Sequence, residues 1–398
     1  MSSWLKVLLL ALVALVLPWD GIRYARQMES ALRESERQSL RSVADTVAAS
    51  LQGRAALLYR YPGTPARGGP YDLTAVPLPA PLSVEGAAGW VGAGGGGRPY
   101  GRGAWRHYGK APHRFAILAG VYGRMLYVLL KVQDPRVVFD APFANPLRRA
   151  AMGDRIWLGY AGPRGGQHAE FFALTGPGPI VARRIVTGEY GRRQAIIDPR
   201  IVGSLQLRAG GYDVEFSMPL SLIDGRFGVL IDDRDRRGAA PLSYGTLSAR
   251  TLRTRGRLIL ASPALPKYLA RFVKPGLRLS VTTPAGAMLA QADELTVPRV
   301  PAPQPGILAR LYHRLVGPHG VRVIETTAPI YGAVHGPVIA RLLLTRISDR
   351  GVWLRNRTLE RMLNVTLATS ALAFIAAAGL AAHLAGQGWG NRRRRRAG

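Results

Sequence analysis

The chain has 398 residues, no cysteine and a formal net charge of +30 at pH 7. The absence of cysteine excludes disulfide bonds and thiolate metal sites. Such a high positive charge is typical of nucleic-acid-binding proteins, but lysine occurs only five times and the arginines are scattered along the chain instead of forming a stripe. We therefore predict that nucleic acid is not a partner of this protein.

Two apolar segments near the ends of the chain have the composition of transmembrane helices. A bilayer core requires roughly 20 apolar residues in a helix, a length that residues 4–19 approach and residues 362–386 meet. A cleaved signal peptide is the alternative for the first segment, although no small-residue cleavage site follows it. A buried core helix is the alternative for the second. We predict an uncleaved transmembrane anchor at 4–19, a transmembrane helix at 362–386 and a basic tail at 387–398.

This prediction places the protein in the inner (cytoplasmic) membrane, with the membrane itself as a partner. Five arginines lie between 346 and 361, before the second segment, and five follow it at 392–396, so the positive charges on its two sides nearly cancel. Long loops cross a membrane largely regardless of their charge. We expect the long loop between the two predicted transmembrane helices to be periplasmic.

Residues 20–60 are predicted to form a juxtamembrane helix. This helix can pack on its own domain or pair with a copy of itself, and we predict a homodimer. Residues 61–80 are rich in proline and glycine, which predicts a linker. The helix is inferred from apolar side chains that recur at helical spacing: Met28, Leu32, Leu40, Val43, Val47 and Leu51.

Residues 81–237 are predicted to form an antiparallel β-sandwich. Apolar and polar side chains alternate over residues 126–132, with Lys131 on the polar side, as in a half-buried strand. Four further runs of β-forming residues are separated by Gly, Pro and Asp turns: RIWLGYAG, IVARRIV, YDVEFSMPLSLI and RFGVLIDD.

Residues 252–348 are predicted to form a small α+β domain. The segment LILASPALPKYLARF is typical of a strand followed by a helix, and two further strand pairs are expected to turn at 284–286 and 332–336. A helix that begins near Asp349 would run directly into the segment 362–386. The predicted fold class is therefore a β-sandwich plus a small α+β domain, flanked by two transmembrane helices.

Several of these segments, in this order, resemble a known family. The N-terminal segment, with Pro18-Trp19 followed by Met28-Glu29, resembles the N-terminus of the membrane histidine kinases of the proteobacterial dedicated sortase system. The segments PLSVEGAAGW, LYVLLKVQD, YDVEFSMPL and GRFGVLIDDRD together resemble the carbohydrate-binding family 9 fold, a β-sandwich. The segment TTPAGAMLAQADEL resembles the membrane-proximal sensor domains of two-component receptors.

The resemblance implies the extracytoplasmic ligand-sensing portion of a two-component membrane sensor histidine kinase. None of the seven histidines is followed by Asp or Glu, as the family's phosphoacceptor motif requires, and the glycine-rich run at 92–97 lacks the Lys-Ser/Thr of a nucleotide-binding loop. ATP would belong to the missing kinase domain, so no cofactor and no catalytic residue is predicted for this chain. The alternative is a membrane-anchored carbohydrate- or envelope-binding protein without a signalling role.

The expected ligand is an extracytoplasmic glycan or another envelope component. Aromatic rings stack on the apolar faces of sugars, which makes Trp105, Trp157 and Tyr160 the candidate ligand-binding residues, with burial in the core as the alternative for Trp157. Clustered carboxylates bind Ca²⁺. A metal site is therefore predicted at Asp232, Asp233 and Asp235, with a solvated turn as the alternative.

Overall fold

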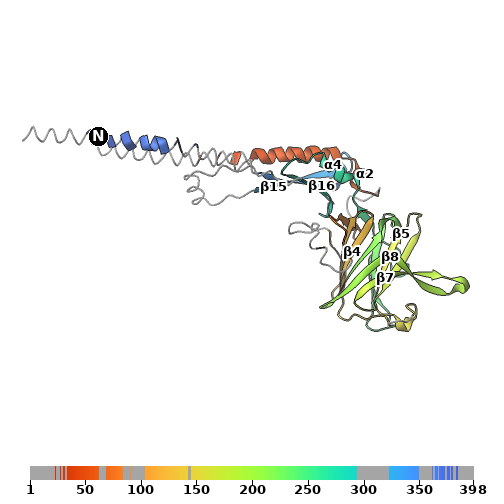
Figure 1. Ribbon diagram of the computed structural model, residues 1–398. Coiled ribbons are helices and arrows are strands. Elements are labelled where there is room, and N and C mark those ends of the chain that lie inside the picture. Colours follow the sequence, from red (N-terminus) through yellow and green to blue (C-terminus); the bar gives the residue numbers. More distant parts are fainter. Residues whose placement is uncertain are drawn as a thin grey trace, which may run out of the picture.

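The computed structural model describes residues 34–61, 69–83, 90, 104–141, 145–293 and 322–348, and in addition single residues and short helical runs between 23 and 31 and between 361 and 383. Most of the described residues belong to two units that lie end to end (Figure 1). One unit is a large bent sheet, and the other is a smaller sheet covered by helices.

The large unit is built from one twelve-stranded sheet. Its strands are β1 (Leu73–Pro77), β2 (Arg106–Lys110), β3 (His113–Tyr122), β4 (Met125–Gln133), β5 (Arg155–Ala161), β6 (Gln167–Ala173), β7 (Gly178–Thr187), β8 (Arg193–Arg208), β9 (Gly211–Pro219), β10 (Phe227–Asp233), β11 (Leu242–Gly245) and β12 (Leu258–Leu260). They follow the order β11-β10-β5-β6-β7-β8-β9-β4-β3-β1-β12, and β2 pairs with β3 beside this path. Strand β1 runs parallel to both of its neighbours, whereas the other pairs are antiparallel.

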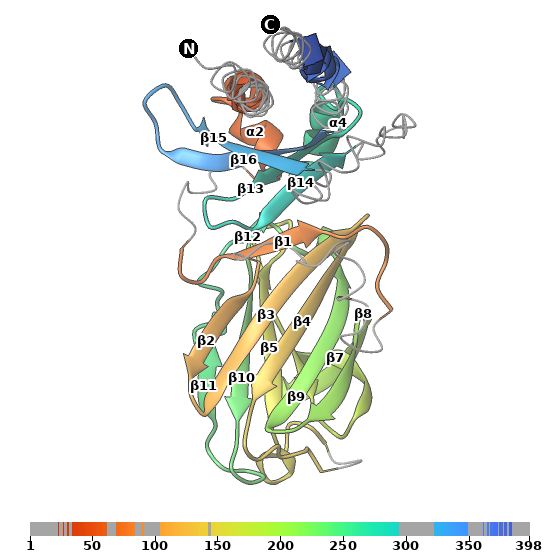
Figure 2. The same ribbon diagram turned by 90° about the vertical axis from the view of Figure 1, so that its left-hand side faces the viewer.

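The sheet bends on itself, so that its two halves enclose one hydrophobic core and form a β-sandwich (Figure 2). Successive side chains of a strand point to opposite faces. Phe115 and Ile117 of β3 therefore enter this core, together with Ile156 and Leu158 from β5 in the opposite half. The predicted β-sandwich is present, and its sheet extends beyond the range 81–237, with β1 before it and β11 and β12 after it.

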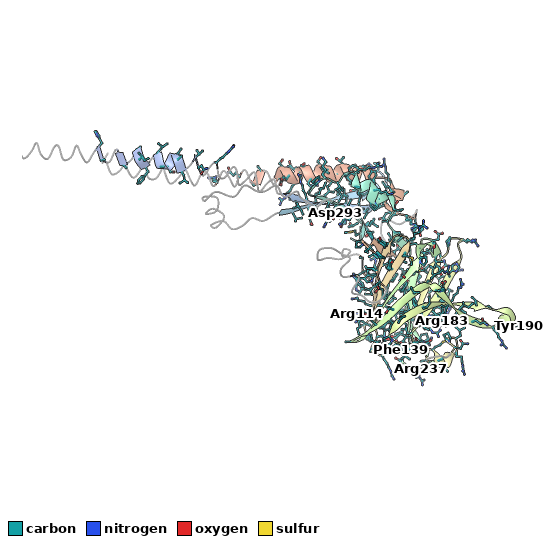
Figure 3. The ribbon with its side chains drawn as sticks, in the orientation of Figure 1. Arg114, Phe139, Arg183, Tyr190, Arg237 and Asp293 are labelled. Carbon is teal, nitrogen blue, oxygen red and sulfur yellow. The ribbon has the colours of Figure 1, made fainter. Side chains whose placement is uncertain are left out.

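Strands β7 and β8 continue beyond the sandwich as a hairpin arm, which we define as residues 182–198. The pairing of the two strands shifts register after Val181, where the arm begins. Tyr190 lies at the tip of the arm, is 95 % exposed and has a positive φ of 67° (Figure 3). The arm therefore projects away from the core instead of covering it.

The smaller unit is a four-stranded antiparallel sheet in the order β14-β13-β16-β15. A helix at residues 34–51 packs on it through Leu40, Val47 and Leu51, whereas Val43 is partly exposed. Of the two packing alternatives for this helix, the described residues show packing on its own domain, and the homodimer remains a prediction. The elements are α2 (Ala55–Leu58), α4 (Ala264–Ala270), β13 (Leu277–Thr282), β14 (Met288–Asp293), β15 (Arg322–Tyr331) and β16 (Val338–Ser348).

The two units are joined by a short connection. The Arg60 amide donates to the carbonyl oxygen of Leu260 at 3.0 Å, and the Tyr59 hydroxyl donates to the carbonyl oxygen of Ile339 in β16. Strand β12 forms the edge of the large sheet, and α4 of the small unit begins a few residues later. Strand β1 lies inside the segment 61–80 for which composition predicts a linker, because its parallel pairing with β3 and β12 supplies hydrogen bonds that local composition does not reveal.

The predicted fold class is wrong in its two flanking transmembrane helices. Among the residues that the structure describes, no helix is both long and apolar enough to cross a membrane. The predicted anchor at 4–19 lies outside the described residues, and so do the tail at 387–398 and most of the helix expected from Asp349. Of the predicted transmembrane helix at 362–386, the structure describes only some residues.

Candidate functional site

A groove crosses the outer face of the sandwich, over β2, β3, β4 and the end of β8. It has a volume of about 360 Å³, which lies within the usual range of small-ligand sites. We call it the basic groove, because four of its lining residues are Arg, Lys or His. Its lining residues are His107, Arg114, Phe115, Ala116, Lys131, Gln133 and Arg208.

Strand alternation brings these side chains to the outer face. Val132 of β4 points into the core, so its neighbours Lys131 and Gln133 point outward. Arg114 of β3 is the partner of Gln133 across the strand pair, and its Nε donates to Gln133 Oε1 at 2.6 Å. The hydrogen bond fixes the position of the Arg114 side chain, and Figure 3 labels this residue on the surface of the sandwich.

The cations of the groove differ in their pairing. Arg208 donates through Nε to Asp213 Oδ1 at 2.7 Å, so its charge is compensated. For Arg114 and Lys131, no carboxylate among the described side chains lies within salt-bridge distance. Two positive charges on this face therefore remain available to a ligand.

Trp105 borders the groove. The Lys131 Nζ lies 5.7 Å from the centroid of the Trp105 ring, a cation–π contact, and Trp105 is half-buried against an apolar cluster on the same outer face. Trp90 lies in this cluster, and its Nε1 donates to the buried carboxylate of Glu215 at 2.7 Å. The cluster forms an apolar wall, and Trp105 lies where this wall meets the cations.

The structure does not bring the three predicted aromatic ligand-binding residues together. Trp157 and Tyr160 both lie in β5, but three positions apart in a strand means opposite faces. Tyr160 is buried in the core and its hydroxyl donates to Glu170 Oε1 at 2.7 Å. Trp157 is half-buried on Phe171 and donates to Asp232 Oδ2 at 2.8 Å. Of the three, only Trp105 borders the groove.

A second charged site is buried inside the lower end of the sandwich. One carboxylate oxygen from each of Asp134, Asp154 and Asp233 lies within 4.8 Å of the others, and we call these three residues the carboxylate cluster. Figure 3 labels Phe139 and Arg237 at this end, where Arg237 Nε donates to the Phe139 carbonyl oxygen at 2.8 Å. The segments that follow β4 and β10 therefore meet around the cluster.

Each carboxylate of the cluster has at least one hydrogen-bond contact with another residue. Asp154 accepts hydrogen bonds from the amides of Val138 (2.6 Å) and Arg234 (2.7 Å). Asp233 contacts His113 Nδ1 at 2.6 Å. Asp134 Oδ1 accepts from the Arg136 amide at 2.8 Å. Gly153 permits the close approach before Asp154, because a Cβ there would lie 2.1 Å from the Val138 carbonyl oxygen.

The electrostatics of the cluster follow from burial and from like charge. The pKa of Asp154 is raised to about 8, mainly by burial and in smaller part by the charges of Asp134 and Asp233, against the opposing effect of its two backbone hydrogen bonds. Burial and the charge of Asp134 also raise the pKa of Asp233. Burial raises the pKa of Tyr212 and Tyr244, and the same three carboxylates add to both shifts. The negative charge of the cluster therefore disfavours ionisation of both phenol groups.

The three predicted metal-site aspartates occupy different environments. Asp233 belongs to the carboxylate cluster, whereas Asp232 accepts hydrogen bonds from Trp157 Nε1 and from the Ser243 hydroxyl (2.5 Å). Asp235 is exposed. Asp134 was missed, although its place directly after a strongly alternating strand marks it as the residue that ends that strand.

The chain has no match among protein-family models or curated proteins. Similar solved structures include a carbohydrate-binding module of family 9 from Caldicellulosiruptor kristjanssonii in complex with glucose (15 % identity, 47 % of this chain and 95 % of that chain, TM-score 0.29). The same module in complex with cellotriose is 16 % identical to this chain, and the match covers 47 % of this chain and 93 % of the module, with a TM-score of 0.29. A proposed carbohydrate-binding protein from Bacteroides uniformis is 14 % identical to this chain, and the match covers 48 % of this chain and 98 % of that protein, with a TM-score of 0.31.

Two of these structures are of a carbohydrate-binding module that holds a sugar. At these identities and TM-scores, the similarity does not establish a function for this chain. The neighbours give no support to the histidine kinase or the sortase-system part of the resemblance.

Proposed function

We propose that the protein binds glycans and that the basic groove takes an acidic polysaccharide. The observation that carries the proposal is the position of Lys131 beside Trp105, with Arg114 in the same groove and neither cation paired with a carboxylate among the described side chains. A guanidinium pairs with a carboxylate through two parallel hydrogen bonds, and an indole ring packs on the apolar face of a sugar. A uronic acid residue offers both features at once.

The polar groups of the groove also suit a sugar. Gln133 presents an amide, and His107 presents an imidazole, to the same space. Such groups exchange hydrogen bonds with sugar hydroxyls, while the cations select the charged saccharide. The charge on the ligand distinguishes this proposal from binding of a neutral glucan.

The test measures binding of the full chain to oligogalacturonate and to a neutral galactose oligomer of equal length, by isothermal titration calorimetry. We expect the acidic oligomer to bind at least tenfold more tightly, and its affinity to fall as salt is raised, because exposed charges are screened. Lys131→Gln and Arg114→Gln should each weaken binding of the acidic oligomer about fivefold or more. Lys267→Gln, which removes an exposed charge from α4 in the other unit, is the matched control.

Equal binding of the acidic and neutral oligomers, or full affinity in both groove variants, would reject the proposal. Single-stranded DNA of matched charge is the third probe. Tighter binding of DNA than of oligogalacturonate, lost in Lys131→Gln, would assign the groove to nucleic acid instead.

A ligand-sensing role is a second proposal, favoured by the connection between the two units. Strand β12 forms the edge of the ligand-binding sheet, and its residue Ile259 is buried in the core of the small unit. Displacement of this strand would therefore reach the small unit without a flexible linker between them. Hydrogen exchange provides the test: saturating oligogalacturonate should change amide protection in β13 to β16. If amide protection changes only around the groove, the protein binds the glycan but the sensing proposal is rejected.

A further inference from the structure

The hairpin arm plays no part in the proposed glycan site, and it exposes large apolar side chains to solvent. Tyr190 at its tip is 95 % exposed, and Ile196 and Ile197 near its base are 46 % and 52 % exposed. Figure 1 shows β7 and β8 continuing beyond the rest of the sandwich. Contiguous exposed apolar surface marks the places where a protein contacts a partner. The arm therefore has the surface of a contact region.

The outer part of the arm has no neighbouring strand. Strand β6 pairs with β7 only at Arg183 and Arg184, and β9 pairs with β8 only from Val202 onward. From residue 185 to residue 195, the ladder among the described residues runs only between β7 and β8. A two-stranded hairpin standing alone is at best marginally stable in water. A partner that covers the arm would therefore also stabilise it.

Strand pairing places cations and apolar side chains together on each face of the arm. Residues that are directly opposite each other in a strand pair share a face. One face has an arginine at each end and apolar groups between them. Its cross-strand pairs are Arg183–Ile197, Ile185–Ala195 and Thr187–Arg193. On the other face, Ile196 lies opposite Arg184. Both faces therefore require a partner that accepts positive charge and apolar surface at once.

The charge of the arm is positive and is not compensated within the described part of the chain. The arm has four arginines and two acidic residues, which are Arg183, Arg184, Arg192 and Arg193, and Glu189 and Asp198. Asp198 is already paired with Arg200, outside the arm. None of the four arginines lies within salt-bridge distance of a carboxylate among the described side chains. A partner that complements the arm therefore carries negative charge.

We propose that the arm binds the surface of a lipid bilayer that contains anionic lipids. The arginines pair with lipid phosphates, because clustered cations are attracted to an anionic leaflet. Tyr190 takes the interfacial position that tyrosine favours in membranes, and the isoleucines face the boundary between headgroups and acyl chains. A bilayer surface thus offers phosphate and hydrocarbon side by side.

Two other occupants fit the arm less well. Nucleic acid supplies phosphates for the arginines, but it offers little apolar surface to Ile196 and Ile197. A second copy of this chain has apolar surface of the same kind, but it brings a net charge of +30 towards the same arginines. Only the anionic bilayer meets both requirements, and the other two are outcomes of the test.

The experiment uses a fluorescent label that reports on the arm alone. Because the chain has no cysteine, Thr187→Cys in the full chain creates a single labelling site at an exposed position of the arm. An environment-sensitive fluorophore there should shift its emission to the blue with vesicles of phosphatidylglycerol and phosphatidylcholine. It should not respond to vesicles of phosphatidylcholine alone, and the response should weaken as salt is raised.

Two controls separate the arm from the rest of the chain. The segments 4–19 and 362–386 are apolar enough to associate with vesicles by themselves, so total binding does not test the arm. The same label at Thr251→Cys, an exposed position of the sandwich outside the arm, should show no shift. Equal shifts at both positions would overturn the proposal.

A pair of charge variants tests the arginines. In the labelled Thr187→Cys chain, the double variant Arg192→Gln and Arg193→Gln removes two exposed charges beside the tip. It should require at least tenfold more anionic lipid for half of the response. The matched control is the double variant Arg250→Gln and Arg253→Gln, which removes two exposed charges of the sandwich and should respond as the parent chain does.

A label at Thr187→Cys that does not respond to anionic vesicles, or responds equally to neutral ones, would overturn the proposal without any charge variant. A full response in the variant of Arg192 and Arg193 would also overturn it. A shift that appears without vesicles, on raising the protein concentration or on adding single-stranded DNA, would assign the arm to a second copy or to nucleic acid instead. Glycan binding is measured with oligogalacturonate and groove variants, so failure of one proposal leaves the other intact.

Discussion

The basic groove and the carboxylate cluster are neighbours in the sequence but differ in their exposure to solvent. Gln133 lines the groove, and the next residue, Asp134, belongs to the cluster. At the start of β3 the order is reversed: His113 contacts the cluster, and the next residue, Arg114, lines the groove. Because successive residues of a strand point to opposite faces, the same two strand ends line the groove with Arg114 and Gln133 and face the cluster with His113 and Asp134.

This difference in exposure separates charges that can bind a ligand from charges that contribute to the stability of the fold. The groove cations keep contact with water, so they are retained at little energetic cost and remain free to attract a ligand. The carboxylates have lost their water and depend on fixed partners. Substitutions in the groove are therefore expected to change binding, and substitutions in the cluster to change stability.

The largest expected effect comes from Asp154. Asp154→Ala removes the acceptor of the Val138 and Arg234 amides and leaves two N–H groups without a partner. Each unpaired buried group costs about 1–3 kcal/mol. We expect the free energy of unfolding to fall by about 2–5 kcal/mol, measured by urea titration at neutral pH.

Arg114→Ala is the matching variant on the other side of the comparison. Arg114 is exposed, and its loss should change the free energy of unfolding by less than about 0.5 kcal/mol. Similar losses in Asp154→Ala and Arg114→Ala would break the distinction between the two sites.

A smaller effect is expected for the tryptophans. Trp157→Ala removes packing on Phe171 and the hydrogen bond to Asp232, so stability should fall by about 3 kcal/mol while the folded variant binds the acidic oligomer normally. Trp105→Ala should do the opposite, with a loss of about 1 kcal/mol in stability and at least fivefold weaker binding. Thermal unfolding and calorimetry on the same samples separate the two outcomes. If only Trp157→Ala weakens binding, the binding site lies on the face of β5 that carries Trp157 and not in the basic groove.

Alternation and runs of β-forming residues between turns predicted several strands, because both are local properties of the sequence. Strand β4 lies in the run that alternation indicates, with Lys131 on the polar side as predicted, and β5, β7, β9 and β10 lie in the four runs of β-forming residues between turns. Strand β1 was missed because its stability comes from parallel pairing with strands that are distant in sequence. Proline and glycine content describes only local preference.

The carboxylate cluster could not be predicted from proximity in the sequence. Asp232 and Asp233 are consecutive residues of one strand, so they point to opposite faces and cannot act as a pair of ligands. The residues that join Asp233 come from the end of β4 and the start of β5. Only the bending of the sheet brings these ends together, and no local pattern records it.

The smallest expected effect concerns Asp198, which is intermediate between the two sites. Its carboxylate is buried, but its partner Arg200, which donates through Nε at 2.8 Å, is 47 % exposed. The hydrogen bonds from Arg200 lower the pKa of Asp198 to about 2. A carboxyl group with a lower pKa in the folded chain stabilises the fold above its unfolded pKa of about 3.8, and this stabilisation is lost as the pH falls towards 2.

Asp198→Asn should therefore lower the free energy of unfolding by about 1 kcal/mol or less at neutral pH, since solvent screens the exposed guanidinium. The difference from the wild type should shrink as the pH falls from about 4 through about 2, because Asp198 of the folded wild type progressively loses its charge. Urea titrations at several pH values measure this, with Asp293→Asn, in the exposed pair with Arg278, as the control. A difference that persists near pH 2 would show that hydrogen-bond geometry at Asp198 matters more than its charge, and Asp198 would then belong with the carboxylate cluster.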